Sequence, residues 1–131
     1  MRTRQSYHLK RREEQAIREA AGLVSARYAG VSSIEFRLTY YQRAADPVLM
    51  ERTLRFFPGS FARFFMRCEH FGCTGGGYDL EPMVDRLVRS RKPSSTGRLF
   101  CHGSDGTIGH GSIAYEITVA YHSAASRAER I

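Results

Sequence analysis

The sequence predicts an α+β fold, with an antiparallel β-sheet of about five strands and two helices. Two periodicities predict this class. Apolar and polar residues alternate along several stretches, as they do in half-buried strands, whereas two other stretches repeat apolar residues at helical spacing. The turns between the first strands are short and contain residues such as Pro58 and Gly59, which favours an antiparallel arrangement.

The first element is predicted to be a helix over residues 10–28. Charged residues dominate one side of it, and Gly30 follows as a suitable end. The other side is apolar at positions i, i+3, i+4, i+7 and i+11, which are Ile17, Ala20, Ala21, Val24 and Tyr28. This apolar side is available to cover the sheet.

Three strands are expected next, over residues 33–41, 48–57 and 61–68. The first alternates cleanly, with Ile34, Phe36, Leu38 and Tyr40 on its apolar face. The third runs straight into Cys68. Because the intervening turns are short, we expect the three strands to form a meander.

A second helix is predicted over residues 79–91, with Asp79 as the N-cap and Pro82 in the first turn. A short strand over residues 98–102 and a longer one over 112–121 complete the order. The last strand has the clearest alternation. One of its faces consists of Ile113, Tyr115, Ile117, Val119 and Tyr121.

The chain length of 131 residues fits a single domain over 1–131. We expect a basic N-terminal helical segment over 1–30, a core over 33–121 and a flexible tail over 123–131. No apolar run approaches the roughly 20 residues that a membrane span needs. The N-terminus lacks the apolar segment of a secretory signal, so a cytoplasmic location is expected.

Three cysteines and a nearby histidine have the composition of a structural zinc site, which needs four Cys or His ligands. Cys68 and Cys73 form a C-x4-C pair at the end of a predicted strand. A hairpin would place Cys101 and His110 opposite each other as the second pair. An odd number of cysteines without a secretory signal argues against a disulfide scaffold. We therefore predict Zn²⁺ as a structural cofactor.

Two other histidines are alternatives for the fourth zinc ligand, and the cysteines also have an interpretation without a metal. His102 is adjacent to Cys101, and neighbouring strand residues point to opposite faces, which disfavours it as a ligand. His70 lies inside the first loop and is a weaker alternative. Instead of binding a metal, the three thiols could also be small apolar core residues.

The stretch Phe64–Leu80, FFMRCEHFGCTGGGYDL, resembles the C-x4-C-x-G-G-[FY]-D-L signature of small, uncharacterised bacterial zinc-ribbon-like proteins. Gly97–Cys101 resembles the segment of that family's third ligand, and residues 113–121 resemble its last strand. The resemblance covers about residues 33–121 and implies a zinc-ribbon-like core. The family's fourth cysteine falls at or near His110, so the resemblance implies a Cys3His site. The family has no assigned activity.

The net charge of +7 comes almost entirely from arginine, which suits phosphate recognition. One window contains basic residues and no acidic one. A nucleic-acid interface is predicted there as an alternative function, through Arg86, Arg89, Arg91, Lys92 and Arg98. Basic residues at a helix C-terminus also suit the helix dipole without any ligand.

A protein-interaction or adaptor role is the function that we expect first, with a protein partner or a second copy of the chain. A zinc enzyme is disfavoured, because three thiolates weaken the metal as a Lewis acid and only Glu69 is near as a base. The glycines at 75–77 could suggest a phosphate-binding loop, but the Walker pattern is missing and Asp79 and Glu81 would repel the anion. We expect no catalytic residues.

Overall fold

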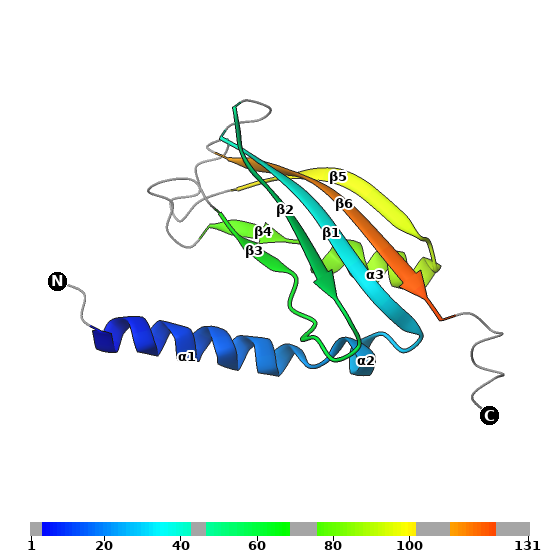
Figure 1. Ribbon diagram of the computed structural model, residues 1–131, viewed down its shortest axis with the longest axis horizontal. Helices are drawn as coiled ribbons and strands as arrows, with labels where there is room; N and C mark the ends of the chain where they lie inside the picture. The colour runs from blue at the N-terminus through cyan, green and yellow to red at the C-terminus, as the bar shows by residue number, and fades with distance from the viewer. Residues whose placement is uncertain (1–3, 43–46, 69–75, 102–110, 123–131) are drawn as a thin grey trace.

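The computed structural model describes residues 4–42, 47–68, 76–101 and 111–122 (Figure 1). The fold is α+β, and all of its described strand pairs are antiparallel. In chain order, the elements are α1 (Arg4–Ala21), α2 (Val24–Arg27), β1 (Val31–Tyr41), β2 (Val48–Phe56), β3 (Phe65–Arg67), β4 (Gly77–Asp79), α3 (Glu81–Ser90), β5 (Ser94–Phe100) and β6 (Ser112–Tyr121).

The main sheet has four strands in the order β2-β1-β6-β5, and β3 and β4 form a separate two-stranded hairpin. Figure 1 shows α3 and this hairpin beside the main sheet, with α1 running along the hairpin and clear of the main sheet. The predicted α+β class and antiparallel pairing are confirmed. The strands number six in the described part of the chain, divided between two sheets, and the helices number three.

The core lies between one face of the main sheet and the layer formed by α3 and the hairpin. On β1, the predicted inner residues Ile34, Phe36, Leu38 and Tyr40 are all buried. They belong to one cluster with Val84 and Leu87 of α3 and with Ile117 of β6. Three aromatic rings close the core beside β2, where Phe64 lies 5.6 Å from Phe36 and 5.0 Å from Phe56 between ring centroids.

The other face of the main sheet is polar and carries paired charges. The Glu35 carboxylate accepts hydrogen bonds from Arg37 at 2.9 Å and from Arg55 at 3.2 Å. These two guanidinium groups hold the pKa of Glu35 below its usual value. Alternation along β1 therefore separates an apolar core face from a charged face, as the sequence predicts.

The first helix differs from its prediction. It begins at Arg4 and ends at Ala21, because Gly22 adopts a φ of +78° and its N–H donates to the Glu19 carbonyl at 3.1 Å. Val24 starts the separate helix α2, so Val24 and Tyr28 reach the core whereas Ile17 is 48% exposed. The prediction of one continuous apolar helix face is wrong, because the break at Gly22 changes the direction of the chain that follows it.

The predicted strand over 61–68 is also only partly correct, since β3 covers just Phe65–Arg67. Residues 60–62 pair instead with the junction between α1 and α2. The Val24 N–H donates to the Ser60 carbonyl at 2.8 Å, and the Ala62 N–H donates to the Gly22 carbonyl at 2.7 Å. The chain from Ser60 to Ala62 is therefore bonded to this junction and not to β2. The strand β3 pairs with β4 instead of β2, so the predicted three-strand meander is wrong.

The C-terminal elements agree better with their predictions. The helix α3 begins at Glu81, two residues after the predicted N-cap, but the Asp79 carboxylate still accepts a hydrogen bond from the Glu81 N–H at 3.0 Å. The predicted short strand 98–102 is the longer β5, which starts directly after Pro93. The strand β6 has the predicted bounds. Within the residues that the structure describes, no helix is long and apolar enough to cross a membrane.

Candidate metal site and basic surfaces

Two of the predicted zinc ligands, Cys68 and Cys101, come together at one end of the molecule. Cys68 directly follows β3 and is 6% exposed, and Cys101 directly follows β5 and is fully buried. The Cys68 N–H donates to the Gly76 carbonyl at 3.1 Å, and the Cys101 N–H donates to the Gly111 carbonyl at 3.0 Å. Both thiols therefore stand on backbone that is fixed by hydrogen bonds beyond the ends of their strands.

Tyr78 of β4 lies beside Cys68 and close to Cys101. Its hydroxyl is 3.9 Å from the Cys68 Sγ, and its ring packs edge-on against Tyr40 with centroids 6.2 Å apart. Burial raises the pKa of Tyr78 well above its usual range, and the neighbouring Cys68 and Cys101 add to the rise. Tyr78 thus stays a neutral hydroxyl that faces the thiols.

Gly111 completes the surroundings of the two thiols. A Cβ at this residue would lie 3.0 Å from the Tyr78 hydroxyl oxygen and 3.6 Å from the Cys68 Sγ. Any larger residue would therefore push the tyrosine or the thiol away. Neither Tyr78 nor Gly111 was predicted as a site residue, although Tyr78 belongs to the G-G-Y-D-L run that follows the C-x4-C pair.

The remaining predicted ligands, Cys73 and His110, lie outside the described residues, as do the alternatives His70 and His102. In the part of the chain that is described, no three Cys, His, Asp or Glu side chains form a metal-binding group. The predicted hairpin of β5 and β6 is present, but its register differs by one residue. Gly111, and not His110, is bonded across from Cys101.

The register has a physical cause. Leu99 of β5 pairs with Ile113 of β6, and both point to the core face. A slip of one residue would turn each apolar side chain of one strand to the charged face. The core thus fixes Gly111 opposite Cys101, and His110 is its neighbour in the chain.

The five predicted nucleic-acid-binding residues do not form one surface. Arg86, Arg89, Arg91 and Lys92 are exposed at the C-terminal half of α3 and just beyond it. Arg98 instead lies on the charged face of the main sheet, since its neighbour Leu99 points to the core. Its guanidinium stacks on the Tyr41 ring at 5.0 Å from the centroid.

The α3 part of this predicted interface also contains an acidic residue. Asp85 lines the same shallow hollow as Arg86 and Arg89, with Pro82 and Ser90. Arg91 is directed elsewhere, because it adopts a left-handed φ of 55° and stacks on the Tyr121 ring at 4.7 Å. The five basic residues that lie close together in the sequence are therefore separated from one another in the fold.

A second basic surface lies between α1 and β3; the sequence predicts a basic N-terminal helical segment, but not that Arg63 and Arg67 lie beside it. Its walls carry Arg11 and Arg18 on the helix and Arg63 and Arg67 on the hairpin side.

Comparison of the chain with protein-family models, with curated proteins and with solved structures found no match. The resemblance to the zinc-ribbon-like family stays a prediction from the sequence motif.

Proposed function

We propose that this protein is a small interaction module whose fold is stabilised by one structural zinc ion. The convergence of Cys68 and Cys101 supports the proposal most directly. Two thiols from the ends of different strands approach one buried tyrosine, and each immediately precedes a segment that contains a further predicted ligand. Thiolate is the donor that structural zinc sites favour.

The residues that would hold the ion are Cys68, Cys73, Cys101 and His110. The chain is long enough for all four residues to reach one ion. Cys73 closely precedes Gly76, which bonds to Cys68, and His110 directly precedes Gly111, which bonds to Cys101. A bound ion would link the end of β3 to the end of β5. Four protein ligands leave no open position for a reactive water, so the proposal assigns zinc a structural role and no catalysis.

Metal content tests the zinc proposal. Protein purified without added metal should contain about one zinc per chain, and Cys68→Ser and Cys101→Ser should each lose it. Tyr78→Phe is the matched control, since it keeps both thiols and the core volume. It should retain the metal. A zinc-free protein in which Cys101→Val is as stable as the wild type would show instead that the thiols are core residues.

The fourth ligand is tested separately with His110→Ala, His102→Ala and His70→Ala. We expect His110→Ala to weaken zinc binding the most, because the resemblance to the zinc-ribbon-like family places the fourth ligand at or near His110. Retention of zinc by His110→Ala, with loss in His102→Ala or His70→Ala, would reject that assignment and keep the thiol ligands. Binding should also weaken in acid, because the thiols must be deprotonated to bind the ion.

The strand β5 is the surface that we propose for a partner. It is an outer strand of the main sheet, and Arg98 is the single charged residue among its seven. Edge strands that avoid pairing usually carry several charges or a proline. The other outer strand, β2, fits that description better, with Glu51, Arg52 and Arg55. A second copy of the chain could pair with β5 about a two-fold axis.

The mass of the protein in solution tests this interface. Light scattering during size-exclusion chromatography should give a dimer that Ser94→Lys with Thr96→Lys converts to a monomer, because charges at an edge oppose pairing. Leu49→Lys with Thr53→Lys adds the same charges at exposed positions of β2 and should leave the dimer intact. A monomer at all concentrations would reject self-pairing, and a dimer lost only in the β2 variant would reject the choice of β5.

A further inference from the structure

The described side chains of α1 from Arg11 to Ala20 form no hydrophobic interface. Each residue from Arg11 to Ala20 is exposed, including the one large apolar residue of this stretch, Ile17. Surface helices of soluble domains normally bury an apolar face, and that burial supplies most of their stability. Along Arg11–Ala20, the position of α1 beside the hairpin therefore does not depend on the burial of an apolar face.

Polar contacts hold α1 beside the hairpin. Its C-terminal end is tied to the chain before β3 by the bond from the Ala62 N–H to the Gly22 carbonyl. Near its middle, the Glu14 carboxylate forms an ion pair with the Arg67 guanidinium of β3. These contacts leave a groove between helix and hairpin, which is lined by Glu14, Ile17, Arg18, Arg63, Phe65 and Arg67 and has a volume of about 340 Å³.

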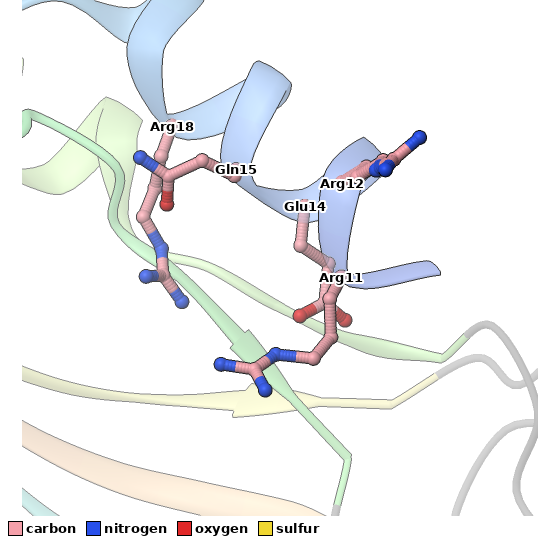
Figure 2. A pocket seen from close by; sticks show the side chains of 5 residues that line it. All are labelled: Arg11, Arg12, Glu14, Gln15 and Arg18. Carbon is pink, nitrogen blue, oxygen red and sulfur yellow. The ribbon is translucent and has the colours of Figure 1, made fainter. Parts of the chain in front are cut away.

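The groove continues along the helix surface. A second hollow of about 360 Å³ shares Glu14 and Arg18 with the first and is also lined by Arg11, Arg12 and Gln15. Figure 2 shows Arg11 and Arg18 extending from the same side of α1, with Glu14 and Gln15 between them and Arg12 pointing away. The spacing of i, i+4 and i+7 places Arg11, Gln15 and Arg18 in one row along the helix.

The charge of this groove is strongly one-sided. Five arginines line its two connected parts, and of these only the Arg12 side chain is seen to point away: Arg11, Arg12, Arg18, Arg63 and Arg67. Among the described residues of the lining, Glu14 is the single carboxylate, and it forms an ion pair with Arg67. Arg11 and Arg18 are two helical turns apart, so their Cα atoms are separated by about 10 Å along the axis. Such a row of cations matches a ligand with repeated negative charges.

Two features favour phosphates over the carboxylates of an acidic protein. All five cations are arginine, whose planar guanidinium binds phosphate oxygens in a bidentate manner. The groove also contains a stacking surface, because the Arg63 guanidinium lies over the Phe65 ring at 4.9 Å from its centroid. Unpaired bases stack on aromatic rings and on arginine planes in proteins that bind single strands. The carboxylates of Asp and Glu have no ring face that could stack on such a surface.

We propose that the groove between α1 and β3 binds the sugar-phosphate backbone of a single-stranded nucleic acid. Arg11 and Arg18 would contact phosphates from the helix, and Arg63 would contact the same strand from the hairpin and offer its plane to a base. The bases of a duplex are already stacked on one another, so a duplex offers no free base to the Arg63–Phe65 surface. The proposal is independent of the zinc site and of β5, because no groove residue belongs to either.

Fluorescence anisotropy with a labelled dodecamer of uridine or thymidine tests the proposal on the full-length protein. The double variant Arg18→Gln/Arg63→Gln removes one cation from each wall and leaves the Glu14–Arg67 ion pair intact. Affinity should fall about tenfold or more, because each wall of the groove loses one charged contact to the strand. The slope of log K against log salt should decrease by about 1.4, since each lost contact to a single strand contributes about 0.7.

The matched control is Arg86→Gln/Arg89→Gln on α3, which removes the same charge from another exposed helix and should change affinity less than twofold. Arg18→Lys/Arg63→Lys should keep most of the salt dependence while weakening binding, because lysine keeps the charge and loses the planar group. Circular dichroism should be the same for all variants. Equal losses in the α3 control, no binding at low salt, or tighter binding of a polyglutamate peptide than of either oligonucleotide would overturn the proposal.

Discussion

At the scale of single residues, the buried face of β6 forms part of the core against which the other elements pack. Ile117 is fully buried and pairs across the sheet with Phe36 on one side and Ser95 on the other. Its neighbours Glu116 and Thr118 are exposed on the charged face. This alternation is clear in the sequence because strand periodicity depends only on local residue order.

The first prediction follows from that burial. Ile117→Ala should lower the free energy of unfolding by about 2–5 kcal/mol, since it removes apolar contacts and leaves a cavity. Thr118→Ala is the control on the same strand and should change stability by less than about 0.5 kcal/mol. Urea denaturation followed by circular dichroism measures both. Similar small values for the two variants would mean that the core packs differently.

Tyr28 carries the second prediction, because its hydroxyl donates a hydrogen bond to the Asp85 carboxylate of α3. Burial raises the pKa of Tyr28 well above its usual range, and the hydrogen bond to Asp85 adds to the rise. A raised folded-state pKa stabilises the protein below the tyrosine's ordinary pKa of about 10, and this stabilisation is lost as the pH rises further.

Tyr28→Phe should therefore cost about 1–2 kcal/mol at neutral pH, the value of a hydrogen bond to a charged group that remains partly solvated. The difference between the variant and the wild type should shrink above about pH 10, where the wild type loses its advantage. Thermal melts at pH 7 and at alkaline pH measure this difference. A gap that stays constant with pH would contradict the role of the hydroxyl.

At the scale of elements, local patterns predicted the strands β1 and β6 well and the N-terminal region poorly. The helical repeat from Ile17 to Tyr28 is real, but Gly22 interrupts it with a positive φ. The short β4 carries no alternation of its own and forms only because β3 is available to pair with it. Such pairings depend on which backbone groups remain unused elsewhere, and local sequence order does not contain that information.

The third prediction tests the break between α1 and α2. Gly22→Ala should destabilise the protein by about 1–2 kcal/mol, the cost of an L-residue in the left-handed region, although space for the methyl group is open. Gly59→Ala is the control, because its Cβ would also meet nothing within 4 Å and its φ is not positive. It should be neutral or slightly stabilising. Equal effects in denaturant titrations would show that the chain conformation at Gly22 is not required.

At the scale of the whole molecule, the two ends of the main sheet are held by different chemistry. At the end that contains α2, Arg27 forms an ion pair with Glu81 at 2.7 Å and Tyr28 bonds to Asp85. At the opposite end, the thiols of Cys68 and Cys101 lie near the Tyr78 hydroxyl. Cysteine spacing predicted a site at this second end. The arginine groove required the placement of α1 beside β3, which rests on contacts such as Glu14–Arg67 between residues 53 positions apart.

The last prediction uses this division. If zinc links the ends of β3 and β5, a chelator should speed amide exchange at Cys68 and Cys101 much more than at Tyr28. The amides of these residues donate to Gly76, Gly111 and Val24, respectively. The first two bonds lie in the linked region, and the third lies in the region held by the ion pairs. An increase of about tenfold at the two cysteines corresponds to about 1.4 kcal/mol of local stabilisation. Native-state hydrogen exchange with and without the chelator measures it.

Equal increases at all three amides would mean that metal loss unfolds the molecule as one unit. No increase at the cysteines would mean that a metal does not stabilise this end of the main sheet and that the thiols stabilise it by packing alone.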